Sequence, residues 1–374
     1  DTLLHNKEHV VGEIDLEYKR RISMNIKKTV FGKTKEGETA SLYTLKNKSG
    51  MTVVFSDYGA TIVNLFVPDA KGKLEDVVLG YDNLDQYTKN SPGFGSFIGR
   101  HANRIGNASF IINGKTYELE KNDGNNNLHS GSKSFNKFIY EAEYYEDEGS
   151  STIEFSRLSP DMEQGFPGNL DVTVTYTLTE DNELVIEYLA VSDQDTVVNF
   201  TNHSYFNLSG HASGSAMNHK VWINTNQFTP TDDYLIPTGE FVNVEGTPMD
   251  FRTAKEISRD INADYKPLKQ GNGYDHNYVL NHETSDVDLV AELIDEVSGR
   301  KMEVYTDTPG MQFYTANFLD KEVGKGGVTY NARDGVCFET QFYPNACNTP
   351  NFPSSIIKAE QEYDYVTIYK FTTI

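Results

Sequence analysis

The sequence predicts an all-β protein, a large antiparallel β-sandwich with a few short helices. Aromatic residues make up 12% of the chain, with 23 Tyr and 21 Phe, and aromatic side chains favour strands. Polar and apolar residues alternate with a period of two in many short runs, and turn-forming residues separate these runs. Helical periodicity is confined to two short stretches, which disfavours a fold of alternating strands and helices.

Two hairpins are the clearest predicted elements. In ASFIINGKTYEL (108–119), Asn113-Gly114 stands between two strand-like runs, and this pair favours a two-residue type I′ turn. In LDVTVTYTLTEDNELVIEYLAV (170–191), apolar residues alternate with three threonines before the turn residues 180–182.

Further strands are expected, in chain order, at MTVVFS (51–56), KVWINT (220–225), YDHNYVL (274–280), KMEVYTD (301–307), GMQFYTANF (310–318) and DYVTIYKF (364–371). Helices are expected only at NLDQYTKN (83–90) and FRTAKEISRDI (251–261). No linker divides the chain into two halves. We therefore expect one sandwich domain over residues 41–374, preceded by an N-terminal extension over residues 1–40.

The charge of the chain narrows the class of ligand. The 374 residues include 33 Lys and Arg against 55 Asp and Glu, a formal net charge of −22. Such a surface repels nucleic acid and anionic membranes. A neutral small molecule is the expected ligand, and neither a nucleic-acid partner nor a membrane span is expected, since no stretch has the apolar length of a membrane helix.

The cysteines and the N-terminus leave the compartment open. Only Cys337 and Cys347 are present, so no disulfide framework is expected. The first residues lack the apolar core of a signal peptide. They also lack an initiator Met, which fits a trimmed or mature form.

The run GVCFETQF (335–342) contains a carboxylate where a buried strand is predicted. Side chains alternate between the faces of a strand, so Glu339 shares one face with Cys337 and Gln341. Taken alone, Glu339 is most simply a residue on the surface of an edge strand, because Glu is seldom buried without a partner.

Four polar stretches together predict a sugar site. They are GRHANRIGNASF (99–110), NDGNNNLHSG (122–131), FTNHSYFNL (200–208) and ETQFYPNACNTPNFPSS (339–355). Taken singly, they also fit solvated loops or a buried core histidine. In combination they offer histidines, a carboxylate, an arginine, amides and aromatic rings. Such polar groups bind vicinal hydroxyls, and aromatic faces cover the C–H patches of a pyranose.

The chain resembles the aldose 1-epimerase (galactose mutarotase) family from about Tyr43 to the C-terminus. Seven stretches match in order: GRHANRIGNASF, NNNLHSG, QGFPGNLDVTVTYTL, NHSYFNLSG, YDHNYVL, PGMQFYTANF and ETQFYPNACNTPNFPSS. Ser130 and Asn345 stand where the family often has Gly and Asp, and the first forty or so residues have no counterpart. The resemblance implies a mutarotase-like sandwich with an open cleft, a monosaccharide substrate, and a monomer or weak dimer.

Carried over position by position, His203 matches the general acid and Glu339 the general base of the family. Asn103, Arg104, His129, Asp275 and Gln312 match residues that hold sugar hydroxyls. Interconversion of anomers needs one proton removed from O1 and one added to the ring oxygen, so no metal or cofactor is expected. Reference pKa values near 4.3 and 6.5 predict an acid limb from Glu339 and an alkaline limb from His203 in the pH–rate profile.

Three alternatives remain open at the level of sequence. A hexose-6-phosphate epimerase would need a basic cluster for the phosphate, and only Arg100 and Arg104 lie near the matched motifs. A glycoside hydrolase would need a second carboxylate, which Asp275 could supply. A lectin-like binding module would have no use for both His203 and Glu339.

Overall fold

A computed structural model describes residues 26–283 and 286–374 of the chain. Most of the N-terminal extension expected from the sequence, residues 1–25, lies outside the described residues. The remainder of that extension supplies β1 (Lys27–Lys33), which pairs antiparallel with β2 (Thr39–Lys46).

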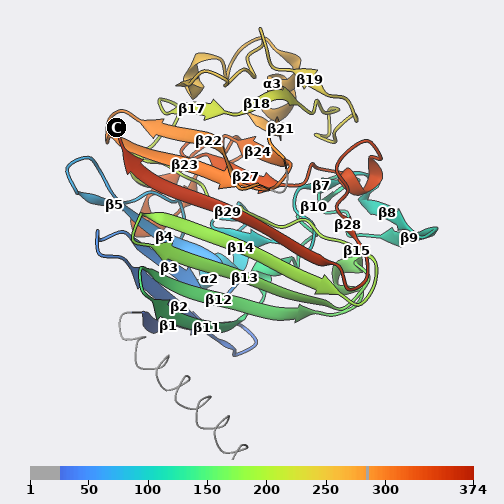
Figure 1. The fold of residues 1–374 in the computed structure, drawn as a ribbon, viewed down its shortest axis with the longest axis horizontal. Coiled ribbons are helices and arrows are strands. Elements are labelled where there is room, and N and C mark those ends of the chain that lie inside the picture. Colours follow the sequence, from blue (N-terminus) through green and yellow to red (C-terminus); the bar gives the residue numbers. More distant parts are fainter. Residues whose placement is uncertain (1–25, 284–285) are drawn as a thin grey trace, which may run out of the picture.

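One layer of the fold is a nine-stranded sheet, which runs through Figure 1 with β29 near its centre. Every neighbouring pair of strands in this sheet is antiparallel. The strand order is β11 (Glu141–Asp147), β12 (Ser150–Ser159), β13 (Leu170–Thr179), β14 (Glu183–Ser192), β29 (Glu362–Thr373), β23 (Arg300–Thr306), β22 (Asp288–Asp295), β17 (Lys220–Ile223) and β20 (Lys255–Glu256).

Two five-stranded antiparallel sheets face the nine-stranded sheet. The first has the order β1, β2, β3 (Thr52–Ser56), β4 (Thr61–Pro68) and β5 (Leu74–Asp76). The second has the order β19 (Val242–Asn243), β18 (Thr225–Phe228), β21 (Asp275–Leu280), β24 (Gly310–Tyr314) and β27 (Cys337–Gln341).

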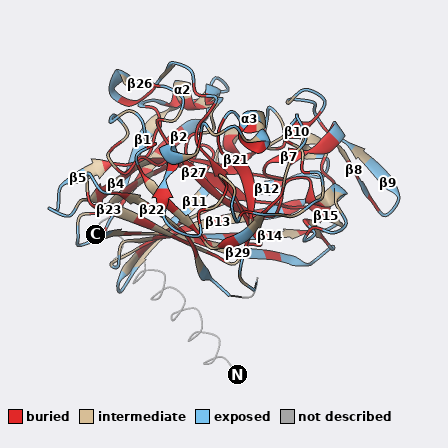
Figure 2. Cartoon of the chain, turned by 90° about the horizontal axis from the view of Figure 1, so that it is seen from above, coloured by how far each residue is buried: buried red, intermediate tan, exposed pale blue. Residues whose placement is uncertain are grey.

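The layers are held together by a continuous apolar core. Phe55 of β3 packs on Tyr176 of β13 with ring centroids 4.5 Å apart. The buried hydroxyl of Tyr369 on β29 donates to the Phe338 carbonyl of β27 at 2.9 Å. Figure 2 shows the buried residues concentrated between the sheets. The predicted all-β sandwich is therefore confirmed.

Short elements connect the sheets and carry most of the polar loops. Paired two-stranded elements are β6 (Ser96–Ile98) with β16 (Thr201–His203), β7 (Arg104–Ile105) with β10 (Asn127–Leu128), β8 (Ser109–Ile112) with β9 (Lys115–Glu118), β15 (Thr196–Val197) with β28 (Ile356–Ile357), and β25 (Glu322–Val323) with β26 (Thr329–Tyr330). The helices are α2 (Leu84–Lys89) and α3 (Lys266–Gly271), with 3₁₀ turns at Gly106–Ala108, Phe135–Lys137, Glu163–Gly165, Ile257–Arg259, Lys325–Gly327 and Ala346–Asn348. Within the described ranges, no helix combines the length and apolar character needed to cross a membrane.

Both predicted hairpins are confirmed. β13 and β14 pair in register from Leu170↔Ser192 to Leu178↔Leu184. β8 and β9 are joined at Asn113 and Gly114, whose φ angles of 51° and 77° are both positive, as a type I′ turn requires.

Of the two predicted helices, one is confirmed and one is wrong. The stretch 83–90 forms α2, capped by the Asn83 side chain, which accepts a hydrogen bond from the Gln86 amide. The stretch 251–261 instead forms β20 and a 3₁₀ turn. β20 pairs with β17 at the sheet edge, and the Lys255 ammonium donates to the Pro248 carbonyl and the Asp260 carboxylate. Tertiary pairing has overridden a weak helical pattern.

Candidate active site

The ends of several short strands bring the predicted polar residues to one cleft. The cleft has a volume of about 360 Å³. It is lined by Ser91, Pro92, Asn103, Arg104, Leu128, His129, His203, Tyr205, Asp275, Tyr314, Phe318, Leu319, Asp320, Glu322 and Glu339. Six of the seven predicted site residues are in this set. Gln312 is the exception.

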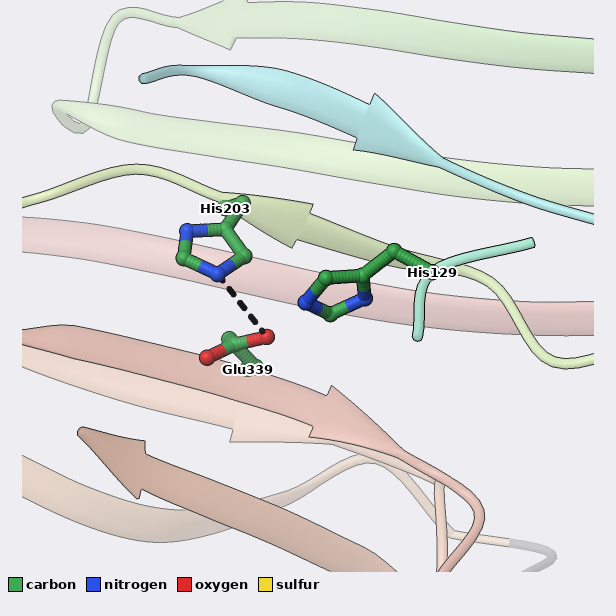
Figure 3. A group of neighbouring side chains, drawn as sticks. All are labelled: His129, His203 and Glu339. Carbon is green, nitrogen blue, oxygen red and sulfur yellow. Dashed lines mark ion pairs between the residues drawn. The ribbon is translucent and has the colours of Figure 1, made fainter. Parts of the chain in front are cut away.

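The centre of the cleft is formed by His203 and Glu339. His203 ends β16, and Glu339 lies in the middle of β27; their side chains are about 7% and 3% exposed. Nε2 of His203 lies 3.6 Å from Oε2 of Glu339, and Figure 3 shows the two side chains pointing toward one another. That Glu339 oxygen has no hydrogen-bond partner among the described residues. Glu339 is therefore not the surface residue that the strand alone would suggest.

His129 completes the group, and a backbone amide fixes its tautomer. The Asn103 N–H donates to Nδ1 of His129 at 2.9 Å, and the His129 N–H donates to the Asn103 carbonyl. Since Nδ1 accepts, the proton of the neutral ring is on Nε2. Asn103 and His129 have positive φ angles of 63° and 50°, strained conformations that occur preferentially at functional sites.

The same hydrogen bond bears on metal binding. Donor atoms of His129, His203 and Glu339 all lie within 4.8 Å of one another, and two histidines with a carboxylate are a familiar ligand set. A metal on Nε2 of His129 would require that nitrogen to lose its proton while Nδ1 faces the Asn103 N–H. His129 is consequently better suited to donate to an oxygen than to ligate a cation.

The remaining predicted binding residues form two supported groups. The Arg104 Nε donates to the Asp123 carboxylate at 2.8 Å, which leaves its remaining N–H groups available to the cleft. Asp275 on β21 accepts a 2.8 Å hydrogen bond from Nε2 of Gln312, two strands from Glu339 in the same sheet. Gln312 therefore lies behind Asp275 and orients its carboxylate.

Burial shifts the pKa values of the central pair toward their neutral forms. Desolvation lowers the pKa of His203 to about 4. Burial raises the pKa of Glu339 well above its usual value, and the nearby Asp275 charge adds to this effect while Arg104 opposes it. Although the two atoms are within ion-pair distance, the neutral pair is favoured, since both groups are desolvated.

This order of ionisation differs from the expectation based on reference values. With one proton on the pair, the proton resides on Glu339 and not on His203. The pKa of His129 is also held well below 6.5 by burial and by the neighbouring His203 and Arg104. The difference arises from desolvation, which the sequence does not report.

Two residues that depart from the family pattern hold loops beside the cleft. The Ser130 hydroxyl accepts from the His101 N–H and donates to the His101 carbonyl. The Asn345 side chain accepts from the Gly106 N–H, and the backbone N–H of Asn345 donates to the Arg104 carbonyl. Both residues have positive φ angles. Arg100, in contrast, is buried away from the cleft and donates to loop carbonyls.

Several lining residues were missed by the sequence analysis. Strand alternation in β24 places Tyr314 on the same face as Gln312, so Tyr314 could have been found from the sequence. Phe318, which is 60% exposed at the cleft, and Tyr205 follow from loop packing that no local pattern predicts.

The chain is similar to known proteins over most of its length. Residues 41–370 match the family model described as aldose 1-epimerase. The galactose mutarotase of Bos taurus is 42% identical over 351 residues, covering 93% of this chain and 99% of that protein. The aldose 1-epimerase of Escherichia coli (strain K12) is 35% identical over 338 residues, covering 90% and 96%.

Two solved structures share the fold over nearly the whole chain. A homologue of aldose epimerase from C. elegans has a TM-score of 0.81 and 30% identity, covering 90% of this chain and 99% of that one. Galactose 1-epimerase from Lactobacillus acidophilus NCFM has a TM-score of 0.82 and 26% identity, covering 93% and 99%.

Proposed function

The chain belongs to the aldose 1-epimerase family and is a mutarotase, and we propose that Glu339 and His203 are its general base and general acid. The substrates we propose are free hexoses of the glucose and galactose class. Glu339 takes the proton from the O1 hydroxyl, and His203 gives a proton to the ring oxygen. The C1–O5 bond breaks, the C1–C2 bond rotates, and the ring recloses on the other face of the aldehyde with the proton transfers reversed.

One observation carries this assignment. The reactive atoms of the acid and the base are 3.6 Å apart. O1 and the ring oxygen are both bonded to C1, so the two proton transfers must occur close together. A pair of groups at this separation can reach both oxygens of one hemiacetal carbon from the same side.

The protonation states fit a reaction that runs in both directions. Apart from the N–H of the neutral imidazole, the pair must carry one proton in total. That proton must be on His203 when Glu339 removes the proton from O1. In the free enzyme this proton is on Glu339, so the reactive arrangement is a minor form that hydroxyl groups and Arg104 stabilise when sugar binds. Because the proton count is the same in both arrangements, catalysis needs only transfer within the pair.

The remaining polar groups hold the sugar hydroxyls. We propose that Arg104, Asp275 and His129 contact the substrate directly, with His129 as an Nε2–H donor. Asn103 fixes the tautomer of His129, and Gln312 fixes the Asp275 carboxylate. Tyr205, Tyr314 and Phe318 provide aromatic surface for the C–H faces of the ring.

Polarimetry on freshly dissolved α-D-glucose and α-D-galactose tests the proposal. Glu339→Gln and His203→Gln should each lower kcat by about 10²–10⁴-fold, the usual contribution of a positioned acid or base. Glu292→Gln, on the outer face of β22, is the matched control and should keep the native rate. Near-native turnover by either cleft variant at saturating sugar would remove that residue from its proposed role.

A further inference from the structure

Strand β27 contacts both ring nitrogens of the His203 imidazole. Oε2 of Glu339 lies 3.6 Å from Nε2, and Sγ of Cys337 lies 3.7 Å from Nδ1. Cys337 and Glu339 are two residues apart, so their side chains lie on the same face of the strand. The strand that supplies the base therefore also supplies a buried thiol to the opposite side of the acid.

We propose that Cys337 is a positioning residue, whose sulfur accepts a hydrogen bond from Nδ1–H of His203, so that the lone pair of Nε2 faces Glu339 and can take up its proton. This proposal rests on the role of His203 as general acid. A neutral imidazole with its proton on Nε2 would have no lone pair toward Glu339, and it could not become the imidazolium that protonates the ring oxygen. The tautomer of His203 therefore decides whether the neutral ring is ready to act.

A thiol suits this position because its sulfur can accept from Nδ1–H in both protonation states of the ring. Toward neutral His203 this contact keeps the proton on Nδ1 and leaves the lone pair of Nε2 free. Toward the imidazolium the same contact persists while Nε2–H faces the sugar. Cys337 is fully buried, and burial raises the pKa of its thiol well above the usual value, which keeps the thiol protonated.

Other elements hold the plane of the ring without contacting Nδ1 by a hydrogen bond. The ring of Tyr205 lies 5.2 Å from that of His203, and the ring of Tyr314 lies 6.3 Å away. The titratable groups that face His203 are Cys337 and Glu339 on β27, His129 after β10, Tyr205 after β16 and Tyr314 on β24. Among the described side chains, only Cys337 has a hydrogen-bond contact with Nδ1 of His203.

Nitrogen NMR of ¹⁵N-histidine-labelled protein measures the tautomer directly. At neutral pH the native enzyme should show His203 with a protonated Nδ1 and an unprotonated Nε2, assigned by the loss of its signals in His203→Gln. Cys337→Ala should show both tautomers, and Cys337→Ser, which keeps an acceptor at this position, should restore the native pattern. A native enzyme with the proton on Nε2, or a native pattern in Cys337→Ala, would overturn the proposal.

Kinetics give a second readout with a matched control. Cys337→Ala should lower kcat by about 2- to 10-fold, as expected for one neutral hydrogen bond, with KM nearly unchanged, and Cys337→Ser should recover most of the loss. Cys347→Ala changes the other cysteine, which is not in the cleft, and should leave both readouts unchanged. An unchanged kcat in Cys337→Ala would contradict the proposal.

Failure of this proposal is distinguishable from failure of the proposed function. If His203 were not the acid, His203→Gln would retain its rate while the tautomer spectra of the Cys337 variants still changed. If His203 were the acid but Cys337 did not position it, His203→Gln would be slow and the Cys337 spectra native. Thermal unfolding of each variant establishes that the measured protein is folded.

Discussion

Two buried pairs of a basic and an acidic side chain in the described part of the chain differ in how fully their polar atoms are hydrogen-bonded. Lys325 lies 2.7 Å from Asp76, and its ammonium also donates to the Val78 carbonyl. Asp76 accepts further hydrogen bonds from the Asn64 side chain and the Leu65 N–H. In the cleft, His203 and Glu339 are 3.6 Å apart, and the facing Glu339 oxygen has no hydrogen-bond partner among the described residues.

The difference separates a structural pair from a reactive one. Buried polar atoms are normally hydrogen-bonded, since an unsatisfied group costs free energy of folding. The Lys325–Asp76 pair meets this rule and links the 3₁₀ turn after β25 to β5. The His203–Glu339 pair does not meet it, because its free atoms are directed at the place where we propose that the sugar binds. A buried pair with unused hydrogen-bonding capacity therefore indicates a ligand site.

Removing the cation of the structural pair should have the largest effect on stability. Lys325→Met leaves the Asp76 carboxylate buried without its ammonium partner, and such a loss typically costs about 3–5 kcal/mol. We expect chemical denaturation to show this loss while kcat per folded molecule stays native. The double variant Lys325→Met/Asp76→Asn should recover part of the stability. A native free energy of unfolding in Lys325→Met would mean that the Lys325–Asp76 pair does not stabilise the fold.

Changing a proposed binding group should have an intermediate effect, and on activity only. Asp275→Asn keeps the shape of the side chain but removes the charge that we propose accepts a sugar hydroxyl. Hydrogen bonds to charged groups contribute about 1.5–3 kcal/mol, so kcat/KM should fall by roughly 10- to 100-fold in polarimetric assays. Asp307→Asn is a matched control, since Asp307 is a half-buried carboxylate that accepts from the Val366 N–H and does not line the cleft. Native kcat/KM in Asp275→Asn would exclude Asp275 from the site.

The pH–rate profile should shift in opposite directions in two cleft variants. In the free enzyme the acid limb of kcat/KM belongs to His203, near pH 4, and the alkaline limb to Glu339, whose pKa is raised. The Asp275 charge raises the pKa of Glu339, so Asp275→Asn should move the alkaline limb to lower pH. Arg104 lowers that pKa, so Arg104→Ala should move the limb to higher pH.

Measurement of kcat/KM between pH 3 and 10 checks both signs in one series, within the range where the fold is retained by circular dichroism. Shifts of the same sign in the two variants would show that the limb does not report Glu339. The assignment of the alkaline limb to Glu339 is also tested in the His203→Asn variant. The residual activity of that variant should keep the alkaline limb, since that limb reports the ionisation of Glu339.

The smallest expected effect is the change in the free energy of unfolding that Glu339→Gln causes. Gln has nearly the shape of Glu and is always neutral, so folding no longer requires a carboxylate to take up a proton in a desolvated position. We expect its free energy of unfolding to stay within about 1 kcal/mol of native or to increase slightly, measured by denaturation in parallel with Lys325→Met. A large loss of stability would place Glu339 with Asp76 as a structural residue.

The sequence by itself determined the elements that local pattern controls. Alternation predicted both hairpins, because the faces of a strand repeat every two residues. The turn at Asn113 and Gly114 followed from the conformational preference of that pair. The matched motifs proposed His203 and Glu339, and the resemblance supplied their roles. Each of these inferences depends on residues that are close together in the chain or on a motif in fixed order.

Only the tertiary structure decided how those residues interact. Cys337 meets His203 across 134 positions of the chain, and Lys325 meets Asp76 across 249. Edge pairing with β17 made residues 255–256 a strand where a helix was expected. Packing also buried the side chains of Glu339 and His203, and this desolvation reversed the order of their ionisation. Desolvation and long-range contact depend on the whole fold, which is why no local pattern in the sequence could report them.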